Sequence, residues 1–149
     1  MKPLAVIADM DGTLCDVRAA ERHVETGGWD AFHRACLECP PHQVAVDWCV
    51  GYHRHGHTIL IVTGRDEWAR KMTEEWLGIH LPVPYAGLFM RADDDHRANV
   101  DVKRDIYHHE LRGRFNIRAA IEDDPTITAL WTGFGIPVTE VPDSDPQTW

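Results

Sequence analysis

The chain has 149 residues, 44% of them hydrophobic, and its 24 acidic and 15 basic residues give a formal net charge of −9. This negative charge argues against a non-specific duplex-DNA binder, whose affinity depends on many Lys and Arg contacts with phosphates. The length predicts a single domain, 1–149, with its own hydrophobic core. No apolar run approaches the roughly 20 residues of a membrane helix, and Met1-Lys2-Pro3 leaves no room for a signal peptide before the first strand. We therefore expect a cytoplasmic protein without membrane contact.

The first predicted strand, 4–8, is an apolar run that leads into Asp9-Met10-Asp11-Gly12-Thr13. Alternation along an extended chain puts Asp9 and Asp11 on the same side. Two like charges at such a short distance are costly unless a cation or a shared proton relieves them. The pair therefore predicts a site of chemistry, with a metal ion as the expected cation.

Residues 15–40 are mixed in character, with a Gly27-Gly28 break and a short helix predicted over 29–37. The segment is too small for a separate domain, and we expect a small flap over the two carboxylates. Its Cys36 and Cys39 have the spacing of half a zinc site, but no second pair follows. Free, partly buried thiols are preferred, with a zinc site that includes nearby histidines as the alternative.

The rest of the chain alternates between helical and extended patterns. Helices are predicted over 41–55, 66–78, 99–111 and 127–134, and strands over 57–62, 87–90, 115–121 and 137–141. This order predicts an α/β, doubly wound, three-layer Rossmann-like fold with a central parallel sheet. We expect two apolar stripes at helical spacing to pack in the core: Val44, Trp48 and Tyr52, and Trp68, Met72 and Trp76.

Polar residues follow three of the predicted strands. Asp9 and Asp11 end the first, Thr63-Gly64-Arg65 the second, and Glu122-Asp123-Asp124 the fourth. Lys103 lies near the start of the helix between the last two groups. Because ligands of open α/β sheets bind at the carboxyl ends of the strands, we expect these side chains to form one site. The Asp93-Asp94-Asp95 run and the histidines at 53, 55 and 57 are expected to be solvated loop and turn residues.

In order along the chain, these groups resemble the four motifs of the haloacid dehalogenase (HAD) superfamily of phosphotransferases. Within it, the chain is most similar to the 3′-phosphatase domain of bacteriophage polynucleotide kinase/phosphatase. The segments that carry this similarity are Trp29-Asp30-Ala31-Phe32, Val62-Thr63-Gly64-Arg65, Leu88-Phe89-Met90-Arg91, Val102-Lys103 and Ile121-Glu122-Asp123. The resemblance implies an HAD fold with a small flap in place of a large cap domain.

The resemblance also implies roles for individual residues. Asp9 would be the nucleophile that forms an aspartyl-phosphate, and Asp11 the general acid and base. Thr63 would hold phosphoryl oxygens, and Lys103 would neutralise charge. Further roles concern ligands: Mg²⁺ would be held by Asp9, the Asp11 carbonyl, Asp123 and the adjacent Glu122, and substrate by Thr13, Gly64, Arg65 and a flap arginine, Arg18 or Arg22.

The expected activity is removal of a 3′-phosphate from a polynucleotide end, because an open site without a large cap suits a bulky substrate. The alternatives are a nucleotidase or small-molecule, acid-type HAD phosphatase, which the net charge favours, and a non-catalytic phosphate-binding HAD module. No Gly-Lys dipeptide occurs, so a P-loop and kinase activity are excluded on this chain. Asn99 and Asp124 depart from the pattern of the resemblance. The pattern predicts no oligomeric state.

Overall fold

A computed structural model describes residues 1–142, with the side chains of Arg22, His23 and Glu25 excepted. In it, five strands form one sheet in the order β3-β2-β1-β4-β5, and every neighbouring pair is parallel. The strands are β1 (Leu4–Ala8), β2 (Thr58–Asp66), β3 (Gly87–Arg91), β4 (Asn116–Glu122) and β5 (Val138–Glu140). The predicted parallel sheet is therefore confirmed.

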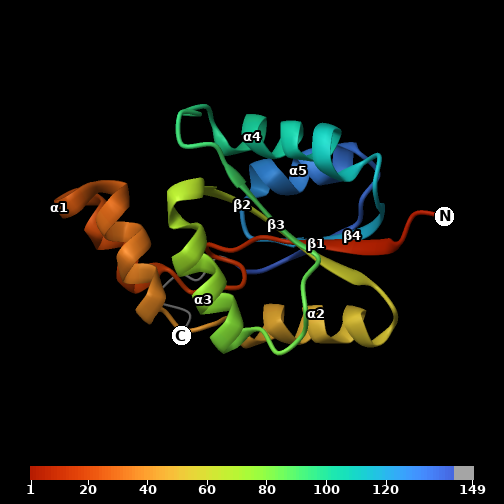
Figure 1. Cartoon of the computed structure of the whole chain (residues 1–149), viewed down its shortest axis with the longest axis horizontal. Coiled ribbons are helices and arrows are strands. Elements are labelled where there is room, and N and C mark those ends of the chain that lie inside the picture. Colours follow the sequence, from red (N-terminus) through yellow and green to blue (C-terminus); the bar gives the residue numbers. More distant parts are fainter. Residues whose placement is uncertain (143–149) are drawn as a thin grey trace.

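Helices cover both faces of this sheet. The helices α2 (Gln43–Arg54) and α3 (Arg70–His80) lie on one face, and α4 (Asn99–Ile106) and α5 (Pro125–Gly133) lie on the other (Figure 1). A π-helical turn, Tyr107–Leu111, continues α4. The result is the predicted three-layer arrangement, because parallel strands need crossover helices that pack back on the sheet.

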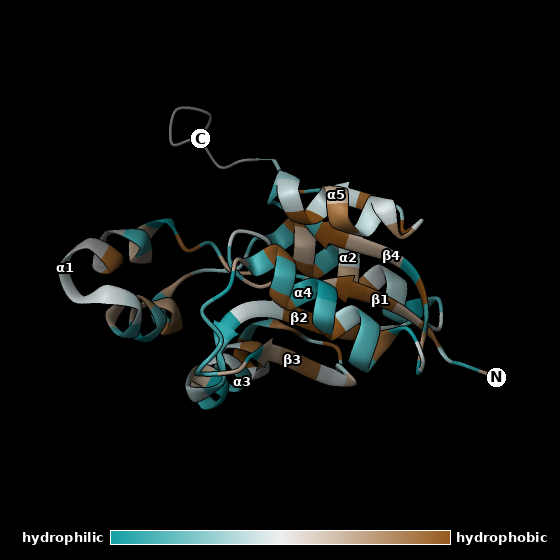
Figure 2. Ribbon diagram, turned by 90° about the horizontal axis from the view of Figure 1, so that it is seen from above, coloured by the Kyte–Doolittle hydropathy of each residue, from teal (hydrophilic) through white to brown (hydrophobic). Residues whose placement is uncertain are grey.

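The core is split into two clusters by the alternation of side chains along the central strands. Val6 and Ala8 of β1 pack with the α2 and α3 side, whereas Ala5 and Ile7 pack with the α4 and α5 side. All four are almost fully buried, and Figure 2 shows the apolar strands enclosed between the helices. Burial on both faces explains why the first strand is a continuous apolar run and not an alternating one.

Helix α1 (Arg18–Ala35) projects from the carboxyl edge of the sheet and makes up most of residues 15–40, the segment expected to form the flap (Figure 1). It corrects the short helix predicted over 29–37, because helical structure begins at Arg18. The predicted glycine break is a kink inside the helix. Gly28 has φ 73° and ψ −168° there, a left-handed backbone that a side chain disfavours. A 3₁₀ turn, Cys36–Glu38, follows the helix.

Two further boundaries differ from the expectation. Strand β2 continues to Asp66, so Thr63, Gly64 and Arg65 lie in an irregular strand end and not in a turn. Helix α3 begins at Arg70, after a 3₁₀ turn, Glu67–Ala69, and it passes through Gly78 without ending.

The predicted apolar stripes are wrong in part. Trp76 is fully buried as expected, but Trp68 lies before α3 and is 36% exposed. On α2, Val44 is 60% exposed, and the helix instead buries Ala45, Val46 and Cys49. Both stripes have helical spacing, so their orientation toward the sheet depends on tertiary packing that spacing alone does not determine.

All four cysteines are free and buried. Among residues 1–142, apart from the three undescribed side chains, the one cluster with metal-ligand spacing contains only carboxylates. The zinc alternative for Cys36 and Cys39 therefore finds no support. No helix of the described part is long and apolar enough to cross a membrane.

The packing of β2 predicts a clear contrast between two isoleucines. Ile59 is fully buried on β2, and Ile79 is 68% exposed on α3. Ile59→Ala should lower the free energy of unfolding by about 2–5 kcal/mol through lost burial and a cavity. Ile79→Ala should change it by less than about 0.5 kcal/mol. Urea unfolding measures both, and equal effects would contradict the assignment of the core.

Candidate active site

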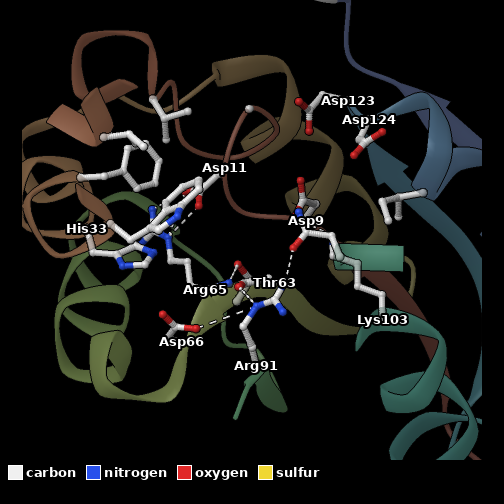
Figure 3. Close-up of a pocket in the computed structure, with 18 of the residues that line it drawn as sticks. Asp9, Asp11, His33, Thr63, Arg65, Asp66, Arg91, Lys103, Asp123 and Asp124 are labelled. Carbon is white, nitrogen blue, oxygen red and sulfur yellow. Dashed lines mark hydrogen bonds and ion pairs between the residues drawn. The ribbon is translucent and has the colours of Figure 1, made fainter. Parts of the chain in front are cut away.

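Three strand ends meet at a cavity of about 600 Å³ at the carboxyl edge of the sheet (Figure 3). Asp9 and Asp11 follow β1, Thr63 and Arg65 lie at the end of β2, and Asp123 follows β4. Helix α4 and the flap complete the walls. The structure thus brings together the groups that the sequence placed at separate strand ends.

Lys103 links two of the carboxylates at the base of this cavity. It is 2% exposed, and its Nζ donates to Asp9 Oδ1 at 2.8 Å and to Glu122 Oε2 at 3.3 Å. Burial alone would lower the pKa of Lys103, but the charges of Asp9 and Glu122 raise it above its usual value. Burial would likewise raise the pKa of Asp9, but the charge and hydrogen bond of Lys103 hold it below its usual value. Asp9 is therefore ionised.

Asp9, Glu122 and Asp123 form a compact group of carboxylates. Each offers an oxygen, and these atoms lie within 4.8 Å of one another. Burial, with the charge of Asp9, raises the pKa of Glu122 to about 9 and that of Asp123 to about 7. When all three carboxylates are ionised, Lys103 offsets only part of their negative charge. The group therefore has the oxygen ligands and the charge to hold a divalent cation such as Mg²⁺.

The turn after Asp9 packs directly against Asp123. Thr13 Oγ1 lies 3.1 Å from Asp9 Oδ2 and 2.8 Å from Asp123 Oδ1, so this hydroxyl connects the two carboxylates. Gly12 has φ +82°, and a Cβ there would lie 2.1 Å from Asp123 Oδ2. Only glycine allows both this backbone conformation and the close approach.

Asp11 points away from Asp9 and forms an ion pair with Arg65. Arg65 Nε lies 3.0 and 3.1 Å from the two Asp11 oxygens, and its terminal nitrogen lies 2.5 Å from Oδ1. The other terminal nitrogen donates to Thr73 Oγ1 at 3.0 Å, and the Thr73 hydroxyl donates to the Ala69 carbonyl at 2.9 Å. The Arg65 side chain is 2% exposed. Arg65, expected to bind substrate, is thus committed to Asp11.

The other expected substrate-binding residues lie at different distances from the cavity. Thr63 and Gly64 line it, and Thr63 Oγ1 accepts from the backbone of Arg65 at 3.1 Å. A Cβ on Gly64 would lie 2.2 Å from Asn99 Oδ1, so a side chain there would displace the Asn99 amide. Arg18 pairs with Asp16 and is absent from the described lining. The side chain of Arg22 lies outside the described residues.

Asp124 serves the local structure of α5. Its side chain accepts from the backbone of Thr126 at 2.9 Å, which caps the helix at its N-terminus. Its own backbone N–H donates to Glu122 Oε1 at 3.3 Å. The cap therefore commits the Asp124 carboxylate to α5, although the residue also lines the cavity, and its backbone helps to orient Glu122.

Two residues that organise the site, Arg91 and Thr73, had no role predicted from the sequence. Arg91 donates to the carbonyls of Gly64 and Asp95 and to Asn99 Oδ1, and so fixes the loop that forms one wall. An arginine at the end of the third strand was the available signal. Thr73 orients Arg65 from inside α3, eight positions along the chain, where no motif marks it.

The raised pKa values predict that the metal-free protein loses stability as pH rises. Folded Glu122 keeps its proton up to about pH 9, but in the unfolded chain it titrates near its usual value of 4.5. Between these values the folded state binds more protons, so the free energy of unfolding falls with rising pH. Asp123, with a pKa of about 7, acts in the same direction from its usual 3.8.

Thermal unfolding in a chelator from about pH 5 to pH 9 measures this slope. Glu122→Gln should flatten the slope, most clearly above pH 7, where Asp123 has titrated. An unchanged slope in the variant would show that Glu122 is already ionised at neutral pH in the folded protein.

Comparisons with known proteins agree with this geometry. The chain matches the family described as "Polynucleotide kinase PNKP phosphatase domain" over residues 3–145. A protein of Autographa californica nuclear polyhedrosis virus, named "Putative bifunctional polynucleotide kinase/RNA ligase", is 26% identical over 137 residues, which cover 91% of this chain and 19% of that protein. The chain thus spans about a fifth of this relative.

Solved structures show the same fold. A chain of the Pnkp1/Rnl/Hen1 RNA repair complex superposes with a TM-score of 0.84 at 21% identity, over 97% of this chain and 44% of that one. The class C acid phosphatase of Bacillus anthracis, with tungstate bound, gives 0.70 at 14% identity, over 97% of this chain and 68% of that one. The chain belongs to the HAD-type phosphatase domain family of polynucleotide kinase/phosphatases.

Proposed function

We propose that the chain is one phosphatase domain, with 15–40 as its flap, that removes a 3′-phosphate from a polynucleotide end through an aspartyl-phosphate at Asp9. The observation that carries this proposal is the state of Asp9. Asp9 is 7% exposed, its carboxylate is ionised and accepts a hydrogen bond from Lys103 at 2.8 Å, and the residue lines the cavity. A buried, charged and accessible carboxylate is suited to attack phosphorus.

Mg²⁺ is the proposed cofactor, because the carboxylate group offers hard oxygen ligands and, once Glu122 and Asp123 release their protons, more negative charge than Lys103 offsets. Asp9, Asp123 and Glu122 would hold it, with the Asp11 carbonyl as a further ligand. When bound, the ion supplies positive charge that offsets the charge of the phosphoryl oxygens.

The chain's own residues perform the proposed bond changes. An Asp9 oxygen forms a bond with phosphorus while the bond to the leaving oxygen breaks, and Asp11, which enters this step protonated, gives that oxygen its proton. Asp11 then takes a proton from the attacking water, phosphate leaves, and the Asp9 carboxylate is restored. Lys103 and Thr63 offset and bind the charge that develops on the transferring group.

The substrate assignment rests on the family and on the open flap. The names of the matched family and of the viral relative both include a polynucleotide kinase. A small-molecule phosphatase is the second candidate, because the net charge of −9 repels a long acidic polymer. A non-catalytic phosphate-binding module is the third candidate.

Asp9→Asn tests the proposed nucleophile. The amide keeps the shape of the side chain but does not attack phosphorus, so phosphate release should fall to background while the protein remains folded. Release from 3′-phosphorylated oligonucleotide, 3′-nucleotides and 5′-nucleotides with Mg²⁺ should be compared for wild type and variant. A higher kcat/KM on mononucleotides than on oligonucleotide would select the second candidate, and no release by the wild type from any of them would exclude the catalytic proposals.

Arg65→Lys tests whether Arg65 positions Asp11 for proton transfer. A lysine loses the two-point contact, and general acid–base catalysis contributes roughly 10²–10⁴-fold. We expect kcat/KM to fall at least about tenfold for an alkyl phosphate, whose leaving oxygen needs a proton. For p-nitrophenyl phosphate, whose leaving group is stable as an anion, the fall should be much smaller. Equal losses of kcat/KM on both substrates would show that Arg65 only supports the structure. Thr73→Val should give the same difference between the two substrates, but a smaller one.

A further inference from the structure

The cavity has a second wall that the proposed phosphoryl chemistry does not use. Its volume of about 600 Å³ lies in the range of small-molecule pockets, roughly 300–1,000 Å³, and exceeds the need of one phosphoryl group. Asp9, Asp11, Thr63 and Lys103 supply the part of the lining that the proposed chemistry uses. The flap supplies another part with Trp29, Phe32 and His33.

Trp29 is an exposed ring on a fixed support. It is 60% exposed, whereas Phe32 and His33 are 4% exposed each. The Trp29 ring meets Phe32 edge-on, with ring centres 5.5 Å apart, and lies at 31° to the His33 ring at 6.3 Å. Because buried neighbours hold it on one side, the ring offers an apolar face at little cost in side-chain freedom.

The arginines that line the cavity already pair with other groups of the chain and are poorly placed to bind the phosphates of a nucleic-acid backbone. Arg65 is paired with Asp11, and Arg91 is occupied by carbonyls and Asn99. Arg97 pairs with two carboxylates at 2.9 and 2.8 Å. Within the described lining, every arginine is therefore already committed, and a net charge of −9 further disfavours recognition through backbone phosphates.

We propose that Trp29 forms a nucleobase subsite, in which it stacks on the base of the terminal nucleotide that carries the scissile phosphate. This proposal rests on the proposed phosphatase function and sharpens its substrate class. The domain recognises the terminal nucleoside and its phosphate, and the rest of a strand contributes little. Stacking tolerates all bases, since each has an aromatic face.

The direct test compares two 3′-phosphorylated oligonucleotides that differ only in whether the terminal nucleotide has a base or is abasic. For the wild type, kcat/KM should be about tenfold or more higher with the base, in the range that base–aromatic stacking supplies. Trp29→Ala should lose this preference, chiefly through a higher KM for the substrate with the base. Its kcat/KM on the abasic substrate should stay within about twofold of the wild-type value. Trp29→Phe should retain most of the preference.

Trp68→Ala is the matched control. Trp68 also contacts the His33 ring, at 5.3 Å, but it is absent from the described lining of the cavity. It should leave the preference for a terminal base within about twofold of wild type. An equal loss for Trp29→Ala on both substrates would indicate a structural role and overturn the proposal.

Two further outcomes bear on the subsite. If the affinity for both oligonucleotides fell steeply and equally with rising salt concentration, backbone phosphates would be the main contacts, and the proposed subsite would be overturned. Calorimetry of the same oligonucleotides with the inactive Asp9→Asn variant, with and without Trp29→Ala, measures the contribution of the subsite to affinity in the absence of turnover. A wild type without activity would therefore reject the phosphatase function, whereas binding that ignores the terminal base would reject only the subsite.

Discussion

The buried contact of Lys103 with Asp9 and Glu122 is the interaction on which the rest of the site depends. An isolated charge in a protein interior costs several kcal/mol, so each member of this group needs the others. The contact joins β1, α4 and β4, which are far apart in the sequence. Because the three carboxylates have one ammonium among them, their full ionisation leaves negative charge that Lys103 does not offset, which is the physical basis of the proposed metal site.

The two aspartates of the first motif have different partners, although they lie two residues apart. Asp9 is held by Lys103 and Thr13, and Asp11 by Arg65. Titratable groups placed in different surroundings are suited to different chemical roles. Two features produce this separation: the turn at Gly12, which packs against Asp123, and the Arg65 guanidinium, which is bound by Asp11 and Thr73. As a result, the proposed nucleophile and the proposed proton carrier do not compete for one cation.

Much of the fold and of the carboxylate site could be predicted from the sequence. The apolar strands and their alternation with helices predict the parallel sheet, and its carboxyl edge brings Asp9, Lys103 and Asp123 together. The exposure of Trp68 and the commitment of Arg65 could not be predicted in this way. A helical stripe does not specify which residue precedes the helix, and the sequence does not show which carboxylate an arginine will meet.

The central claim is that Asp9 carries the phosphoryl group during turnover. The most direct measurement is acid quenching of the wild type during turnover of a substrate with a radioactive 3′-phosphate, followed by peptide mapping. We expect label on the peptide that contains Asp9, only when Mg²⁺ is present, and none in Asp9→Asn. Release of phosphate without any labelled protein, or with label on another residue, would contradict it.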